Sequence, residues 1–446
     1  MRAMIKAFHD NGIAVIMDVV YNHTSSTKTG SLYDTTVPQY FYSVDDSGTY
    51  FSGSGCENNV DTRHVMVRKY VIDSLVHWVK NYHINGFRFD LMGCIDKETM
   101  KEVYDTLYAL DKNILVYGEP WTGGPTGFDG SVESTSAGKG TLGYGYGAFD
   151  DDFRDAVKGG EFGGFKLGQV QGTYSDNIET GLVGDVISSN KRNPTGITGL
   201  ALHYAECHDN FTLFDKLVYS TIAPLSGDAF ADKFDAAYKA VMADENKLKT
   251  IKKEQILAGA YILLSQGTPF LNGGQEFLRT KKGDPDSYSA DTKGGIKWTT
   301  RYGKDGSYVP ATDIDDVNTI NLGMKTTYAD VYNTYKGLIA LRKNHAAFRN
   351  ATSATATKLK KGITSYTVTD GAETFEVIYN ATDSIYSNVK LNGSTFGVGI
   401  QDIDVGFEIA KGKLVSINET NGSVKIADTA SRITSVPAKS FVILKK

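Results

Sequence analysis

Apolar residues in the first 350 positions alternate between two periods. Residues 4–8 carry apolar side chains at helical spacing before an Asn-Gly pair, and the run 14–20 (AVIMDVV) is β-branched and apolar except for one acid. Such a run is typical of a strand buried on both faces. The unit then repeats, because helical spacing over 65–82 is followed by GFRFDL from Gly86. The pattern predicts helices that alternate with buried strands.

The alternation continues with a helix over 97–110 and short apolar runs at 114–118, 146–149, 202–205 and 269–271. Alternating helices and strands imply parallel pairing through right-handed crossovers. From about residue 350 the helical spacing ends, and runs such as FEVIYNA, GKLVSINE and KSFVILKK alternate between Gly, Asn and Asp turns. These runs predict an antiparallel sandwich. We place the domain boundary after Phe348, with a catalytic domain at 1–348 and a β-sandwich domain at 349–446.

Composition narrows the class of protein. An apolar share of 41% and a charged share of 22% over 446 residues are those of an ordinary globular protein. The net charge of -5, without long runs of one sign, argues against nucleic acid or an anionic membrane as partner. No apolar stretch predicts a membrane span, and the N-terminus resembles an amphipathic helix more than a signal peptide. These features leave the compartment open, leaning to the cytoplasm, and we expect a monomer.

Three cysteines, Cys56, Cys94 and Cys207, are too few and too far apart for a disulfide framework, and none forms a C-x-x-C pair. Free thiols are expected. Aromatic residues make up 11% of the chain, and although most of them suit the core, their faces also pack against the C–H side of sugars.

Polar side chains follow nearly every predicted strand. In chain order they are Asp18 and His23, Arg88 and Asp90, Glu119, His208 and Asp209, and Glu276. In a parallel barrel the carboxyl ends of the strands and their loops form the active-site face. Acids that are far apart in the sequence are therefore expected to converge.

Arg88 and Asp90 are two residues apart on a strand, so both side chains point to the same face. A neighbouring guanidinium favours the charged carboxylate, as a nucleophile requires, although a purely structural ion pair explains the same pattern. Glu119 lies in YGEPW, between Tyr117 and Trp121. Apolar surroundings favour the protonated form, which suits a general acid.

Two carboxyl groups about 5 Å apart make a retaining glycosidase, which works through a covalent sugar ester. His208 and Asp209 in AECHDN and His23 in VVYNH supply further groups for sugar hydroxyls, although a lone histidine is as often structural.

Four motifs in order, DVVYNH, GFRFDLMG, YGEPW and ECHDN, resemble the four signature regions of the alpha-amylase superfamily of glycoside hydrolases. GFRFDLMG, GEPW and PFLNGGQEFLRTKKGDPDSYSAD are most similar to type I pullulanases. The resemblance implies a (β/α)8 TIM-type barrel followed by a small all-β sandwich, and hydrolysis of alpha-1,6-glucosidic links in pullulan and branched alpha-glucans.

Carried over position by position, the resemblance implies that Asp90 is the nucleophile, Glu119 the acid/base and Asp209 the acid that stabilises the oxocarbenium-like sugar. His23, Arg88 and His208 would bind that sugar, and Asp18 would steady the loop. Trp121, Glu276 and Arg279 are weaker substrate-binding candidates. No cofactor is required. Many relatives bind calcium, and acid-rich loops at 284–291 and Asp150 to Asp152 have oxygen groups that could ligate a structural calcium ion.

The chain departs from the family in two places. Cys207 stands where Ser is expected, at a residue that is not catalytic. The chain also begins at the helix before the third barrel strand, so we expect a barrel that lacks its first two strands, with exposed sheet edges and weak activity. Alternatives are an isoamylase or glycogen-debranching enzyme, an alpha-1,4-acting hydrolase or transglycosylase, an inactive fragment, and a non-catalytic amylase-like binding protein.

Overall fold

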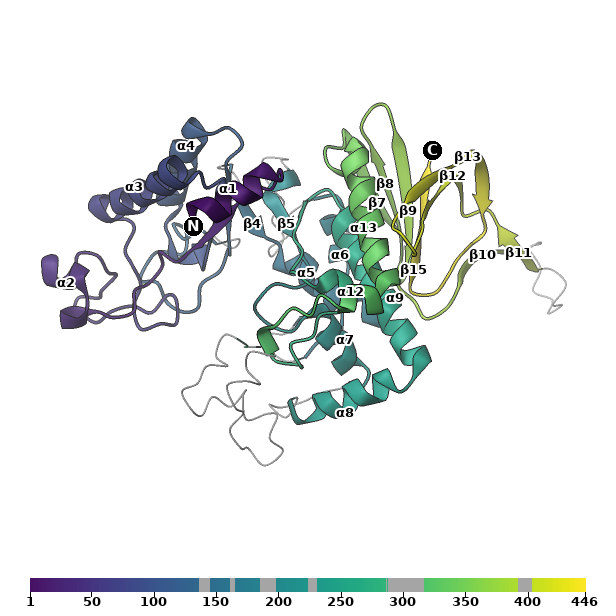
Figure 1. The fold of residues 1–446 in the computed structure, drawn as a ribbon, viewed down its shortest axis with the longest axis horizontal. Helices are drawn as coiled ribbons and strands as arrows, with labels where there is room; N and C mark the ends of the chain where they lie inside the picture. Colours follow the sequence, from purple (N-terminus) through teal and green to yellow (C-terminus); the bar gives the residue numbers. More distant parts are fainter. Residues whose placement is uncertain are drawn as a thin grey trace. The chain divides into compact units, whose positions relative to one another are not determined.

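The computed structural model describes residues 1–135, 145–160, 165–184, 198–223, 231–285, 287, 317–391 and 403–446. They fall into two compact units. The first unit comprises Met1–Asp150 and Val186–Leu202, and the second comprises Asp151–Asp185 and His203–Lys446. Figure 1 shows the elements of each unit along the colour gradient from purple to yellow.

The first unit is built on parallel strands that lie in chain order. They are β1 (Ile16–Val19), β2 (Gly86–Phe89), β3 (Leu115–Gly118), β4 (Gly147–Phe149) and β5 (Ala201–His203), the last of which ends in the second unit. The helices of this unit are α1 (Arg2–Asp10), α2 (Leu32–Thr36), α3 (Val65–Tyr82) and α4 (Lys97–Leu110). The predicted alternation of helices and parallel strands is confirmed in this unit.

A hydrophobic core lies between these strands and the helices α3 and α4. It contains Val71 and Leu75 of α3, Val103 and Leu107 of α4, and strand residues such as Phe87. Figure 1 shows α3 and α4 side by side. Their apolar side chains recur every three or four residues, so one face of each helix turns to the sheet.

Strand β1 departs from the prediction that it is buried on both faces. The side chain of Asp18 is 55% exposed, and Val20, just after the strand, is 52% exposed. Among the described residues of this unit β1 pairs only with β2, so side chains at its other edge have no neighbouring strand to cover them. The apolar run alone could not reveal which strands lie beside β1 in the sheet.

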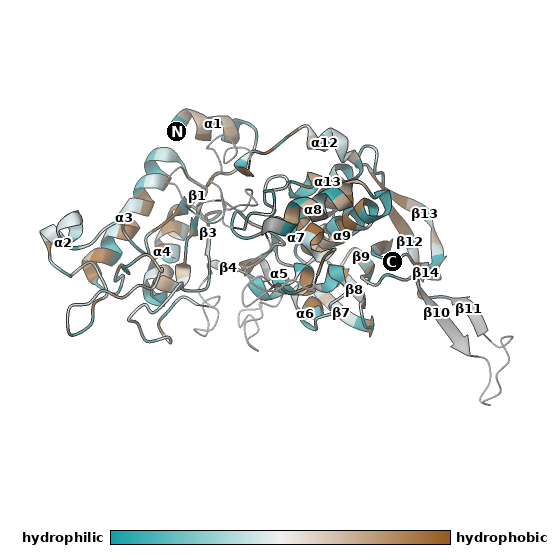
Figure 2. Cartoon of the chain, turned by 90° about the horizontal axis from the view of Figure 1, so that it is seen from below, coloured by the Kyte–Doolittle hydropathy of each residue, from teal (hydrophilic) through white to brown (hydrophobic). Residues whose placement is uncertain are grey.

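The second unit begins with helices. They are α5 (Asp151–Lys158), α6 (Asn177–Leu182), α7 (Leu213–Ser220), α8 (Ala231–Met242), α9 (Glu245–Leu264), α12 (Met324–Thr327) and α13 (Ala329–Asn344). A short strand, β6 (Thr268–Pro269), follows α9, and the amide of Phe270 donates to the carbonyl of His203 over 2.8 Å. Helices α9 and α13 pack together, and Figure 2 shows apolar residues concentrated on them.

Antiparallel strands complete the second unit. They are β7 (Ser353–Lys360), β8 (Ile363–Thr369), β9 (Thr374–Asn380), β10 (Tyr386–Leu391), β11 (Ile403–Phe407), β12 (Ala410–Ile417), β13 (Val424–Ile433), β14 (Ser435–Val436) and β15 (Ser440–Lys445). One sheet has the order β13-β12-β15-β9-β8-β7, and the other has the order β11-β10-β14. The predicted change from helices to antiparallel strands near residue 350 is confirmed.

These strands share a core with helices of the same unit. Val377 and Tyr379 of β9 belong to one buried cluster with Tyr261 of α9 and Leu338 of α13, and the rings of Tyr261 and Tyr379 stack with their centroids 4.3 Å apart. The division of the chain into domains at residue 348 therefore stays a prediction. Among the described residues, no helix combines the length and apolar character that crossing a bilayer requires.

Candidate active site

The candidate site in the first unit starts from the register of its parallel strands. Asp18 on β1 lies opposite Arg88 on β2, and Arg88 lies opposite Tyr117 on β3. The chain leaves β2 directly before Asp90 and leaves β3 directly before Glu119. Because parallel strands end at the same edge of a sheet, the two acids emerge side by side there.

One guanidinium joins three carboxylates at this edge. Nη1 of Arg88 lies 2.9 Å from Asp18 and 3.0 Å from Asp90, and Nη2 lies 2.5 Å from Glu119. Burial alone would lower the pKa of Arg88, but the carboxylates of Glu119, Asp18 and Asp90 outweigh it and raise that pKa. Arg88 therefore stays charged and fixes the acids around itself.

Asn22 adds a contact that the sequence analysis missed. Its side-chain amide is buried and donates to the backbone carbonyl of Asp90 over 2.7 Å and to its carboxylate over 2.9 Å. His23 Nδ1 lies 2.5 Å from the side-chain oxygen of Asn22. The loop after β1 therefore contacts Asp90 through Asn22, and His23 is linked to Asp90 by way of its contact with Asn22. Asn22 lies in the motif DVVYNH between Asp18 and His23, which the sequence analysis had selected, and this position was the one feature of the sequence that could have indicated its role.

Glu119 is only 5% exposed but has polar partners. One carboxylate oxygen lies against Arg88, and the other accepts the backbone N–H of Leu91 over 2.8 Å. Leu91 adopts a positive φ of 38°, which is unusual for a branched residue and is typical of strained functional turns. The surroundings of Glu119 are thus less apolar than YGEPW suggested, because Arg88 comes from a strand distant in the sequence.

Gly93 explains why GFRFDLMG ends in glycine. A Cβ atom at this position would lie 2.4 Å from the backbone oxygen of Trp121. The amide of Gly93 also donates to the carbonyl of Glu119 over 3.2 Å. The segment after β2 therefore packs directly against the segment after β3. Trp121, a weaker candidate, is half-buried in that second segment.

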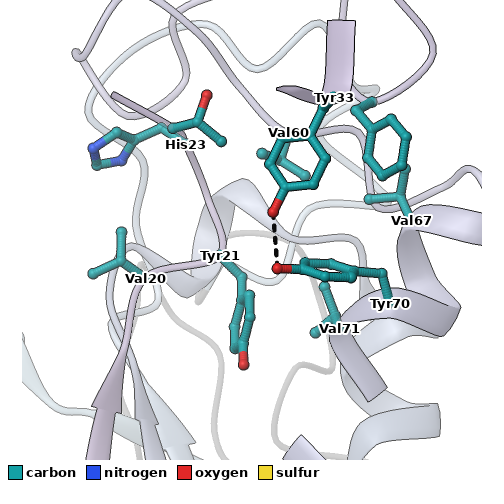
Figure 3. A pocket seen from close by; sticks show the side chains of 10 residues that line it. Val20, Tyr21, His23, Tyr33, Val60, Val67, Tyr70 and Val71 are labelled. Atoms are coloured by element: carbon teal, nitrogen blue, oxygen red, sulfur yellow. Dashed lines mark hydrogen bonds between the residues drawn. The ribbon is translucent and has the colours of Figure 1, made fainter. Parts of the chain in front are cut away.

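A pocket with an aromatic lining lies next to His23. Figure 3 shows the hydroxyl groups of Tyr33 and Tyr70 joined by a hydrogen bond of 2.8 Å, with Tyr21 below them and His23 on the other side. Burial, together with the neighbouring Tyr70, raises the pKa of Tyr33 above its usual range. Rings and hydroxyl groups around one hollow are suited to packing against a sugar.

In the second unit, His208 and Asp209 lie in a turn after β5, with 3.4 Å between Nε2 and the carboxylate. Glu206 is buried just before them, and burial raises the pKa of its carboxyl group to about 7. Both His208 and Asp209 are partly open to solvent, with side chains 58% and 42% exposed. The side chains of this turn are therefore accessible to a ligand.

Glu276 and Arg279 follow β6 in the same unit. Glu276 accepts the amide of Gly274 over 3.1 Å, and Arg279 donates to the carbonyls of Gly273 and Asn318 over 3.2 and 3.1 Å. Both side chains are therefore engaged with nearby backbone. Their roles as substrate-binding residues stay a prediction.

Calcium binding stays a prediction. Within the described ranges no group of three His, Cys, Asp or Glu side chains could hold a metal ion. Asp150 to Asp152 fall inside those ranges, whereas most of the predicted loop at 284–291 lies outside the described residues.

The structure thus brings together Asp18, Arg88, Asp90 and Glu119, with His23 linked through Asn22. His208 and Asp209 lie together in the second unit. The meeting of Asp209 with Asp90 and Glu119 stays a prediction.

Comparison with known proteins gives consistent relatives, although no family model matches the chain. The chain is 31% identical to the pullulanase of Bacillus subtilis over 362 residues, which are 79% of this chain and 43% of that protein. It is 27% identical to isoamylase 3 of Oryza sativa over 66% of this chain and 38% of the relative. The chain thus spans less than half of the length of these relatives.

Solved structures agree. The pullulanase of Bacillus acidopullulyticus superposes with a TM-score of 0.76 at 30% identity, over 100% of this chain and 48% of that one. A pullulanase of Paenibacillus barengoltzii in complex with maltohexaose and alpha-cyclodextrin gives 0.72 at 28% identity, over 100% of this chain and 60% of that one. Together with the four ordered motifs, these similarities show that the chain belongs to the pullulanases of the alpha-amylase family.

Proposed function

We propose that this chain carries the catalytic machinery of a retaining glycoside hydrolase that cleaves alpha-1,6-glucosidic links in pullulan and branched alpha-glucans. The observation that carries the proposal is the pair of carboxylates, Asp90 and Glu119, on one guanidinium at the carboxyl edge of a parallel sheet. Two acids that touch the same side chain fit the separation of about 5 Å that retaining enzymes use. The similarity to pullulanases supplies the substrate.

In this proposal the reaction has two displacements. Asp90 attacks the anomeric carbon while Glu119 gives a proton to the departing glycosidic oxygen, and a covalent sugar ester forms on Asp90. Glu119 then takes a proton from water, which attacks the same carbon and releases Asp90. The bonds to Asn22 and Arg88 hold the Asp90 carboxylate in one orientation, which reduces the entropic cost of attack. Carboxylates and water suffice for both steps.

The other residues receive roles from the family resemblance. Asp209 would stabilise the positive charge that develops on the sugar, and Arg88, His23 and His208 would bind that sugar. The barrel arrangement, which would place the turn of Asp209 beside Asp90, belongs to the same proposal. The aromatic pocket next to His23 supports a sugar as the ligand.

Pullulan hydrolysis tests the substrate. In a version of the protein that spans the full length of its relatives, we expect maltotriose as the product, since cleavage of alpha-1,6 links in pullulan releases that trisaccharide, whereas panose would indicate an alpha-1,4-acting enzyme. Asp90→Asn and Glu119→Gln should each lower turnover by several orders of magnitude. Asp73→Asn, at an exposed acid of α3, is the matched control and should keep parental turnover. Retained turnover in either active-site variant would refute the roles.

A trapping experiment separates the nucleophile from the acid. With an alpha-maltotriosyl fluoride, departure of fluoride needs little help from an acid, so Glu119→Gln should still form the ester on Asp90. Mass spectrometry of peptic peptides should then show a maltotriosyl adduct on the peptide that contains Asp90. An adduct on any other residue would contradict the assignment.

An isoamylase-type specificity is the second candidate, because rice isoamylase 3 is among the relatives. Rates on pullulan and on glycogen, measured in parallel, distinguish the two candidates. A strong preference for glycogen would favour the isoamylase type.

A further inference from the structure

We propose that Glu206 is a positioning residue for the turn that carries His208 and Asp209. Its carboxyl group ties the start of this turn to helix α7 and to the segment after β6. The proposal deepens the proposed function, on which the importance of the turn rests. It concerns contacts within the second unit only.

Glu206 is 1% exposed and makes two bonds to separate elements. One oxygen accepts the backbone N–H of Leu213, the first residue of α7, over 2.5 Å, and the other accepts the side-chain amide of Asn272 over 3.1 Å. The first amides of a helix have no partner within the helix, so a buried acceptor there has a structural purpose. The turn between Glu206 and Leu213 is thereby closed into a loop with fixed ends.

The middle of the turn is held from another side. Lys281 is buried, and its Nζ donates to the carbonyl of His208 over 2.8 Å. The backbone amide of Lys281 in turn donates to Asp215 of α7 over 2.8 Å. Asn210 takes a positive φ of 62°, a left-handed conformation that asparagine tolerates in tight turns. Glu206 and Lys281 therefore fix the turn at two points.

The charged neighbours of Glu206 come from two parts of the second unit. Lys158 lies at the end of α5, and Arg279 and Lys281 lie in the segment after β6. Lys158 itself donates to the carbonyl of Phe211 over 3.2 Å, within the same turn. These cations and the bonds to Leu213 and Asn272 offset part of the cost of burying the carboxyl group.

Swapping the hydrogen-bond acceptor at position 206 with the donor at position 272 tests whether this bond positions the turn. In Glu206→Gln the new NH₂ group faces the NH₂ group of Asn272, so one bond is lost. In the double variant Glu206→Gln with Asn272→Asp the donor and acceptor are reversed, and both bonds can form again. Glu419→Gln, at an exposed acid of the same unit, is the control.

Hydrogen exchange of the peptide that covers residues 207–213 is the first readout. Glu206→Gln should speed its exchange about tenfold, because a bond to a buried charged group is lost. The double variant should restore slow exchange, and Lys281→Met should speed exchange of the same peptide by removing the other support. Pullulan turnover is the second readout, with kcat about 100-fold lower in Glu206→Gln, an unchanged KM and recovery in the double variant.

The proposal would be overturned if Glu206→Gln kept the parent's hydrogen-exchange rate at residues 207–213 and the parent's kcat. It would also be overturned if the double variant restored neither of these two quantities. If the parent releases no maltotriose from pullulan, the proposed function fails, while the exchange of residues 207–213 still decides whether Glu206 holds the turn. If Glu206→Gln does not fold, Lys281→Met decides through the same peptide.

Discussion

At the residue scale, Arg88 is the side chain on which the candidate site depends. Its guanidinium is 8% exposed and contacts the carboxylates of Asp18, Asp90 and Glu119. Glu119 is nearly as buried, and Arg88 lies directly against one of its carboxylate oxygens. An unpaired charge in such a place costs far more than the loss of an exposed ion pair.

Replacement of Arg88 by Met should therefore lower the free energy of unfolding by about 3 kcal/mol, the low end for breaking a buried pair. Lys69→Met removes an ion pair with Asp73 in which the two side chains are 59% and 62% exposed, and should cost less than about 1 kcal/mol. Urea denaturation of both variants checks the contrast. Equal losses would show that the Arg88 cluster is no more than a surface ion pair.

Glu206 predicts a dependence of stability on pH. Burial raises the pKa of its carboxyl group to about 7 in the folded chain, from 4.5 when unfolded. Below the lower value its contribution is fully present, and it falls as pH rises toward 7, because only the unfolded chain readily releases the proton. The loss is up to about 3 kcal/mol at 1.36 kcal/mol per pKa unit.

We therefore expect the difference in unfolding free energy between the parent and Glu206→Gln to shrink as pH rises from about 5 to about 8. Denaturation series at several pH values measure this difference. The exposed Glu419→Gln should give a difference that stays flat, and a flat difference for Glu206→Gln would contradict the argument.

At the element scale, the contact between the segments after β2 and β3 decides the geometry of the two acids. Gly93 leaves room for the backbone of Trp121, and the amide of Leu91 reaches Glu119. The end of β2 therefore positions Glu119, the acid after β3, by backbone contact as well as by the ion pair with Arg88.

Gly93→Ala should push the segment of Glu119 and Trp121 aside, because its Cβ would lie 2.4 Å from a backbone oxygen. We expect a loss of about 1–3 kcal/mol, as for other overpacked sites, and lower pullulan turnover. Gly130→Ala, where no atom lies within 4 Å of the added Cβ, should change neither. Thermal unfolding and turnover of the two variants give the answer, and equal behaviour would disprove the close approach.

The helices and strands also show which predictions from the apolar pattern were correct and which was wrong. Helices over 65–82 and 97–110 and the strands after residue 350 are confirmed, because each depends on side-chain spacing within one segment. The burial of β1 was predicted wrongly, because the covering of a strand depends on its neighbours in the sheet.

At the scale of the whole molecule, the reactivity of the three cysteine thiols indicates which parts of the chain are folded. All are free, as predicted, and Cys56 is exposed whereas Cys94 is buried and Cys207 is half-buried. Burial raises the pKa of Cys94 to about 12 and that of Cys207 to about 11, so their reactive thiolate forms are scarce in the folded chain.

A thiol reagent at pH 8 should thus label Cys56 quickly and the other two slowly, with all three reacting equally in denaturant. Mass spectrometry of the labelled peptides follows each site separately. Labelling of Cys94 as fast as Cys56 would show that the first unit opens readily.

The sequence by itself determined the order of helices and strands, the change to antiparallel strands and the acids that follow the strands, because these depend on local spacing and on short motifs. Only the tertiary structure decided that Arg88 lies against Glu119 as well as Asp90, and that Asn22 binds Asp90. It also joined Glu206 to Asn272. The contacts Arg88–Glu119, Asn22–Asp90 and Glu206–Asn272 join residues 31 to 68 positions apart. They depend on strand register and on the close approach of backbone segments, which local spacing does not encode.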